Sequence, residues 1–224
     1  DVIDFITIST AGNAADFGDL TDQRQWVFGA ASSRVRGVWT GGFTPSISDI
    51  IDFVTISSTG NALDFGNLVD SRGAHAGFGN ETRGVFGGGN PETSSNKTDG
   101  IEFITIASTG NALNFGSLES STASLCGTAS PTRGLFMGGY TPSVLDTIQF
   151  VTIASTGNTQ DFGDLTSARH GGGMMTSATR GVITGSWPGA ASNIIDYINI
   201  ATTADAIDFG DLTFSGLSNG AARG

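Results

Sequence analysis

The chain has 224 residues, of which 38% are hydrophobic and only 14% are charged, and its formal net charge is −11. Such an acidic surface repels phosphate backbones, which argues against nucleic acid as a partner. A single cysteine, Cys126, excludes an internal disulfide framework, and no apolar run approaches the roughly 18 residues of a membrane span, so membrane insertion is not expected.

The first predicted strand runs from Ile3 to Ile8, a segment rich in β-branched and aromatic residues and too short for a helix period. The Gly-Asn pair at 12–13 is typical of a hairpin turn, and residues 16–20 are then predicted to pair back on the first strand. Residues 25–33 predict a third strand. Residues 36–42 predict a fourth strand, which ends in a glycine pair where the backbone turns sharply.

This pattern recurs through the whole chain, which predicts a single repeat domain over residues 1–224. Isoleucine opens each copy at positions 3, 51, 101, 148 and 195. Four strands per repeat without a helical stretch indicate the blades of an all-β propeller. A parallel β-solenoid is the alternative, but its coils usually need fewer residues. The repeats span about 3–50, 51–100, 101–147, 148–194 and 195–224.

The phase of the repeat predicts how the propeller closes. The chain begins at the third strand of one blade and ends at Arg223-Gly224, where a second strand should begin. A composite blade from residues 3–20 and 214–224 would therefore close a five-bladed ring without an open sheet edge. Because the last repeat is short, three completions stay open: a short composite blade, residues beyond Gly224, or a partner chain.

Two residue types recur at fixed repeat positions and are interpreted as structural. Each phenylalanine of the Asp-Phe-Gly type is expected to pack between blades, beside an aspartate that accepts hydrogen bonds from nearby backbone N–H groups. Each arginine of the Arg-Gly type is expected to pair with an acid of a neighbouring strand or blade, such as the position of Asp4; the alternative is a ring of arginines that binds an anion near the axis. These positions are Phe17, Phe65, Phe115, Phe162 and Phe209, and Arg36, Arg83, Arg133 and Arg180.

The sequence predicts neither an enzyme nor a cofactor. His75 and His170 occupy unrelated repeat positions, so they imply no metal cluster and no catalytic dyad. The Asp-Phe-Gly triplets lack the glycine-rich nucleotide loop of a kinase, and no Gly-x-Ser-x-Gly elbow appears. Cys126 lies in an apolar, small-residue strand and is predicted to be a buried structural thiol. Paired acids such as Asp16 and Asp19 suggest calcium only weakly, because other copies replace them.

The loops after the glycine pairs are the predicted binding surface. They place an aromatic residue and a proline at matching repeat positions, which lie on one rim of a propeller. Exposed aromatics tend to dominate interfaces, so this rim is a candidate site for sugars or a protein partner. The alternative is that each aromatic packs over the edge of its own blade. The candidate residues are Phe43, Pro45, Asn90, Pro91, Tyr140, Pro142, Trp187 and Pro188.

The order of these signals resembles the kelch repeat. The resemblance rests on the glycine doublets, the acidic-aromatic pairs and the arginines that open the small-residue strand. It departs from the family in carrying Phe where kelch repeats usually have Trp, and Gln149 in place of one acid. The residues concerned are Gly41-Gly42, Gly87-Gly88 and Gly138-Gly139; Asp4-Phe5, Asp52-Phe53, Glu102-Phe103 and Asp196-Tyr197; and Arg24, Arg72 and Arg169.

The repeat contains the segments STGNA, DFGDL and TRGVFGGG. In these segments its sequence is similar to kelch-like arrays in virion proteins of marine bacteriophages, notably tail fibres and tail-associated proteins. The resemblance implies a structural or recognition module of a virion. Its expected partners are other virion proteins, a host-surface glycan or protein, and further copies of the chain in the particle. The alternative is a secreted or cell-surface lectin. A copper oxidase of the galactose-oxidase kind does not fit two unrelated histidines.

Overall fold

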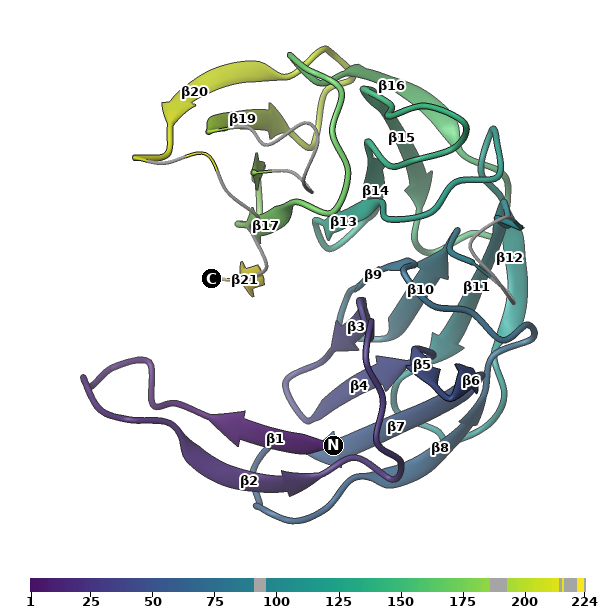
Figure 1. Ribbon diagram of the computed structural model, residues 1–224, viewed down its shortest axis with the longest axis vertical. Coiled ribbons are helices and arrows are strands. Elements are labelled where there is room, and N and C mark those ends of the chain that lie inside the picture. The colour runs from purple at the N-terminus through teal and green to yellow at the C-terminus, as the bar shows by residue number, and fades with distance from the viewer. Residues whose placement is uncertain (91–95, 186–192, 214, 216–220, 224) are drawn as a thin grey trace.

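The protein is an all-β repeat array in the computed structural model, which describes residues 1–90, 96–185, 193–213, 215 and 221–223. Within this part of the chain, no helix is long and apolar enough to cross a membrane. Four antiparallel four-stranded sheets follow one another around a common axis, like the blades of a propeller (Figure 1). The predicted repeat of four-stranded β units is therefore confirmed.

The strands of each blade follow chain order from the axis outward. Blade 1 contains β3 (Gly29–Ser32), β4 (Arg36–Thr40), β7 (Ile50–Thr55) and β8 (Leu63–Asn67). Blade 2 contains β9 (Ala76–Gly79), β10 (Arg83–Gly87), β11 (Gly100–Thr105) and β12 (Leu113–Ser117). Blade 3 contains β13 (Cys126–Ala129), β14 (Arg133–Met137), β15 (Thr147–Thr152) and β16 (Gln160–Asp164). Blade 4 contains β17 (Gly173–Thr176), β18 (Arg180–Thr184), β19 (Ile194–Asn199) and β20 (Ile207–Asp211).

Small residues allow the inner strands to crowd together around the axis. The innermost strands β3, β9, β13 and β17 contact one another in sequence. A Cβ atom added at Gly77 would lie 2.5 Å from the backbone nitrogen of Ala30 in the neighbouring blade. Glycine at this position therefore permits a backbone approach that a side chain would block.

The hydrophobic core lies mainly between blades. Phe53 and Phe65 of blade 1 pack in one cluster with Ile104, Ile106 and Ala112 of blade 2. Equivalent clusters join blade 2 to blade 3 and blade 3 to blade 4. Because each blade buries its apolar face against its neighbour, the array is stabilised one junction at a time, as in other repeat proteins.

Two details of the predicted strands were wrong. The segment predicted at 25–33 is a strand only over Gly29–Ser32, and the residues before it lie at the end of the blade. The Gly-Asn pair does not form a tight hairpin turn. In blade 1 the turn is made earlier, where Ser58 N donates to Thr55 O at 3.2 Å, and Gly60 and Asn61 instead reach the preceding sheet.

The two ends of the chain do not form the expected composite blade. The hairpin of β1 (Val2–Phe5) and β2 (Ala15–Asp19) is a sheet of its own, and Figure 1 shows an opening between it and blade 4. β21 (Ala221–Arg223), from the segment expected to join the hairpin, pairs in parallel with β17 instead. The inner edge of β17 offers unpaired backbone groups that this short segment can use. The structure thus shows an open arc.

Candidate binding rim

The loops of the rim begin at glycine pairs whose conformation excludes other residues. In blade 1, Gly41 and Gly42 have φ angles of 61° and 108°. A Cβ atom on Gly41 would lie 2.2 Å from the carbonyl oxygen of Arg72, and Gly42 N donates to that oxygen at 2.9 Å. In blade 2 the pair in this conformation is Gly88 and Gly89. The glycine pairs therefore tie each rim loop to the next blade.

Buried ion pairs fix the chain at the base of the rim. Arg24, Arg72 and Arg169 contact Asp52, Glu102 and Asp196 respectively, each within one blade. The Arg72 guanidinium also donates to Gly100 O at 2.8 Å. Burial lowers the pKa of Arg72 and raises the pKa of Glu102, because desolvation outweighs their mutual attraction. These pairs anchor the segment that leads from the rim into each inner strand.

Blade 3 replaces this ion pair with a neutral one, which explains the departure at Gln149. Thr122 stands where the other blades have arginine, and Gln149 stands where they have the acid. Gln149 Oε1 accepts hydrogen bonds from Glu119 N at 2.9 Å and from Thr159 Oγ1 at 2.7 Å. Both members of the pair have changed together, so no charge is buried without a counter-charge.

Among the described residues, no Arg-Gly arginine pairs with an acid, and for Arg36, Arg83 and Arg133 that expectation was wrong. Arg36 Nη1 donates to Ile106 O at 2.8 Å in the next blade, and the two equivalent bonds are Arg83 to Ile153 O and Arg133 to Ile200 O, both 2.9 Å. Each guanidinium also stacks on an aromatic ring of its own blade; for Arg36 this is Phe53, 4.5 Å from the ring centre. The acids Asp52, Glu102 and Asp196 pair instead with the buried arginines.

The Gly-Asn-Ala loops complete the contact between blades, which we call the inter-blade joint. Gly60 N donates to Phe17 O and Ala62 N to Asp19 O, both at 2.8 Å, and Asn61 Oδ1 accepts from Asp19 N at 3.2 Å. The same loop of blade 2 bonds to β8, that of blade 3 to β12, and that of blade 4 to β16. Three joints therefore share one backbone pattern. The fourth, whose loop is Ala204-Asp205-Ala206, keeps the bonds from Ala206 N to Asp164 O and from Asp164 N to Asp205 Oδ1.

The recurring phenylalanines lie under these loops, as the sequence predicts, with one exception. Phe65, Phe115 and Phe162 are each 3% exposed and Phe17 is 9% exposed, but Phe209 is 58% exposed. The neighbouring aspartates accept backbone hydrogen bonds as expected; Asp64 Oδ1 accepts from Gly66 N at 3.0 Å. Phe209 belongs to β20, at the end of the described array, where no further blade covers it.

Three predicted rim residues occupy equivalent backbone positions. Phe43, Asn90 and Tyr140 each pair with a residue just before the inner strand of the same blade. The residue after that partner has positive φ: 58° at Trp26, 52° at Ala74 and 56° at Ser124. Pro45 and Pro142 are exposed. Pro91, Trp187 and Pro188 lie outside the described residues.

The rim aromatics have neighbours that the sequence did not reveal. Trp26 is 51% exposed and lies 5.6 Å from the ring of Phe43. Tyr140 is 40% exposed; His170 lies 5.6 Å from its ring, and Lys97 Nζ 4.7 Å from its centre. The sequence predicts that Trp26 belongs to the strand at residues 25–33, so it does not predict a place for this residue on the rim. Trp26 and Tyr140 therefore contact neighbouring side chains and still keep part of their surface exposed to solvent.

A pocket of about 430 Å³ adjoins the rim at Phe43. Its lining combines an aromatic ring with carboxylate, amide and guanidinium groups. One buried polar atom of its lining, Arg24 Nε, lacks a hydrogen-bond partner among the described residues. Aromatic faces beside planar polar groups suit a ligand that is both apolar and rich in hydroxyls, such as a sugar. The lining residues are Asp1, Gln23, Arg24, Gln25, Phe43, Thr44 and Pro45.

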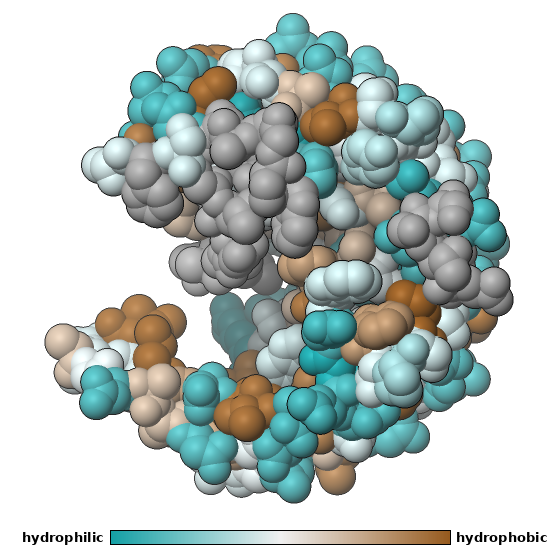
Figure 2. All heavy atoms as spheres, viewed as in Figure 1, coloured by the Kyte–Doolittle hydropathy of each residue, from teal (hydrophilic) through white to brown (hydrophobic). Residues whose placement is uncertain are grey.

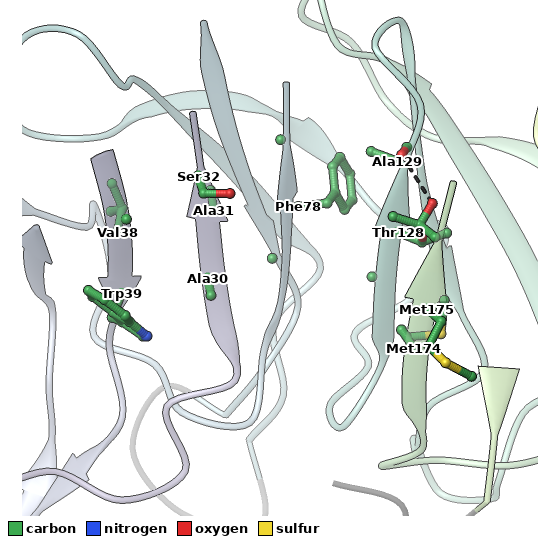
Figure 3. Close-up of a pocket in the computed structure, with 15 residues that line it drawn as sticks. Ala30, Ala31, Ser32, Val38, Trp39, Phe78, Thr128, Ala129, Met174 and Met175 are labelled. Carbon is green, nitrogen blue, oxygen red and sulfur yellow. Dashed lines mark hydrogen bonds between the residues drawn. The ribbon is translucent and has the colours of Figure 1, made fainter. Parts of the chain in front are cut away.

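A second pocket of about 280 Å³ lies at the axis, among the inner strands (Figure 3). Ala30 and Ala31, Phe78, and Met174 and Met175 line it from β3, β9 and β17. None of its described lining residues carries an ionisable side chain. This lining accordingly supplies no general acid or base from its own groups.

His75 and Cys126, two further candidate chemical groups, are both buried. His75 is fully buried, its Nε2 lies 2.8 Å from Thr40 Oγ1, and burial together with the charge of Arg72 lowers its pKa to about 3. Cys126 is buried as predicted, and burial raises the pKa of its thiol to about 11. Among the described side chains, no group of three or more His, Cys, Asp or Glu residues could hold a metal ion.

No family model matches the chain, and no curated protein matches it.

Proposed function

We propose that the protein is a non-enzymatic recognition module in which rigid blades present the rim loops to a binding partner. The observation that carries this proposal is the rim itself. Phe43 and Tyr140 stand on the same backbone position of different blades, yet their surroundings differ, with Trp26 beside one and His170 and Lys97 beside the other. A constant scaffold with variable exposed loops is the usual arrangement of a binding protein.

We assign the module to a bacteriophage particle, in a tail fibre or another surface protein, as a kelch-like five-bladed ring. The sequence similarity of the repeat to arrays in phage virion proteins supports this assignment. The joints support it physically, because repeated hydrogen bonds such as those of Gly60 and Arg36 tie each blade to its neighbour. A stiff disc of this kind can hold the rim in a fixed direction toward other virion proteins or a host surface.

Antibody labelling tests the assignment to a particle. An antibody raised against the purified chain is applied to phage particles from the same source and located by gold labelling in electron micrographs. Label at one fixed place on the particle supports the proposal. Label found only on material separate from particles contradicts it.

A second candidate function, a free glycan-binding lectin, is favoured by the pocket beside Phe43. Binding of the purified chain to a glycan array tests it, with Trp26→Ala and Tyr140→Ala compared with Leu63→Ala. Leu63 is 62% exposed but lies on β8, away from the rim, so it is a matched control. Glycan binding lost in the two rim variants and kept in the control supports rim recognition of sugars. Equal binding by all three variants contradicts it.

A further inference from the structure

The outward face of blade 4 carries one open half of an inter-blade joint. Phe209 is 58% exposed, whereas Phe65 in the same position of a completed joint is 3% exposed. A Cβ atom on Gly66 would lie 2.6 Å from the backbone of Gly110, but one on Gly210 would meet nothing within 4 Å. Among the described residues, no loop covers β20 as the loop of blade 2 covers β8.

Arg180 is the second element of this open half. Its guanidinium lies 4.7 Å from the centre of the Tyr197 ring, as that of Arg133 lies 4.4 Å from the centre of Phe150. Arg133 also donates to Ile200 O of the next blade, but no hydrogen bond from the Arg180 side chain is found within the described part of the chain. Arg180 thus stacks as Arg133 does, but within the described residues no carbonyl of the next blade accepts from it.

The N-terminal hairpin carries the matching open half. Ile8 is 92% exposed and Ile56, in the blade next to the hairpin, is 46% exposed, whereas Ile106, Ile153 and Ile200 at the same repeat position are at most 1% exposed. Its Gly-Asn-Ala loop, residues 12–14, is exposed, and a Cβ atom on Gly12 would meet nothing within 4 Å. Figure 2 shows hydrophobic surface on this hairpin at the edge of the opening.

We propose that these two halves form a fifth inter-blade joint within the same chain. By the pattern of the other joints, Arg180 donates to Ile8 O, Gly12 N to Phe209 O, and Ala14 N to Asp211 O, while Asn13 Oδ1 accepts from Asp211 N. Only outer strands and loops take part, so β21 can stay on β17. Closure buries Ile8 and Phe209, the most exposed members of their repeat positions.

The hairpin of the same chain is the partner that the geometry favours. Each joint turns the next blade about a common axis (Figure 1). The hairpin of the same chain lies on the other side of the opening that blade 4 borders. The chain's own hairpin is also held nearby at high effective concentration. Closure requires the four existing joints to rotate in the same sense until the opening in Figure 1 is shut.

Cross-linking tests the fifth joint directly. Asn13→Cys and Asp211→Cys are combined in one chain, and a short bismaleimide is added at low protein concentration. The matched control is Asn67→Cys with Asn111→Cys, because Asn111 Oδ1 lies 3.1 Å from Asn67 N in a completed joint and both residues are exposed. Cys126 is buried in both variants. Peptide mass spectrometry then identifies which cysteines are linked.

A link between residues 13 and 211 within monomers, at a yield similar to the control, supports the proposal. Covalent dimers whose yield rises with protein concentration would show that a second copy is the partner and would overturn it. Absence of any such link beside an efficient control would also overturn it.

Hydrogen exchange of the unmodified chain gives an independent reading. Closure predicts that the Ala14 amide exchanges as slowly as the Ala62 amide, which donates to Asp19 O at 2.8 Å. Exchange of Ala14 at the rate of an unprotected loop contradicts closure, even if the cysteine variants fail to fold. This inference concerns the proposed ring and not the particle, so its failure would leave the binding role intact.

Discussion

The buried pair of Arg72 and Glu102 offers a stringent test of how the rim is anchored. Glu102→Gln removes the nearer of two carboxylates beside a guanidinium that is fully buried; the other, on the exposed Asp70 side chain, lies 4.0 Å away. Leaving a buried charge without its partner costs about 3–5 kcal/mol of unfolding free energy. The carboxylate accepts from Val69 N on one oxygen and from Arg72 on the other, but the amide of glutamine has only one acceptor oxygen. We therefore expect Glu102→Gln alone to be strongly destabilising.

The double variant, Arg72→Thr with Glu102→Gln, copies the neutral pair of blade 3. It loses the arginine hydrogen bonds to Gly88 O and Gly100 O, worth about 1 kcal/mol each, together with some packing, but it buries no unpaired charge. The double variant should lose about 2–3 kcal/mol of unfolding free energy, which is less than the summed losses of the two single variants, Glu102→Gln and Arg72→Thr. The coupling energy of the double-mutant cycle should therefore be about 2 kcal/mol or more.

Urea unfolding followed by circular dichroism, on the parent chain and all three variants, measures this cycle. The slope with urea concentration must stay constant for the free energies to be compared. Additivity of the single changes to within about 0.5 kcal/mol would refute the reasoning, because it would mean that the charges do not depend on each other.

Three further changes test other parts of the structure. His75 has a folded-state pKa of about 3 against about 6.5 when unfolded, so only the unfolded chain gains a proton just below pH 6.5. The free energy of unfolding should therefore fall by about 1.4 kcal/mol for each unit that the pH is lowered between these values. Urea titrations should show a smaller fall of this free energy with pH in His75→Gln. Gly66→Ala should lower the melting temperature more than Gly60→Ala, because both residues have positive φ but only Gly66 faces a neighbouring backbone; equal shifts in calorimetry would contradict the joint. The thiol of Cys126 should react with Ellman's reagent only after unfolding, since it is buried and its pKa is about 11; rapid reaction of the native chain would be inconsistent with that burial.

The repeat itself was predictable because its period, its strands and its glycine pairs are local patterns. The strand ending at Gly41-Gly42, for example, follows from residue types alone. Likewise, one free thiol in an apolar strand was enough to predict that Cys126 is buried.

The contacts between repeats were not predictable from local patterns. Arg36 donates to Ile106 O, 70 residues away, and nothing around Arg36 distinguishes a carbonyl partner from an acid. The Gly-Asn pair at 60–61 has the composition of a hairpin turn, yet it bonds the preceding sheet. The role of Trp26 on the rim was hidden because an apolar residue before a strand reads as part of that strand. In each case the partner lies in another repeat, which only the fold brings near.

Sedimentation of the native material tests the proposed role in a particle most directly. The fraction that contains the chain is identified, and the mass of the polypeptide is read from that same fraction. The proposal predicts that the chain sediments with large particles and separates from them only on denaturation. Sedimentation as a free species near 22.9 kDa, the mass of these 224 residues, would contradict the virion assignment and leave the lectin as the remaining candidate.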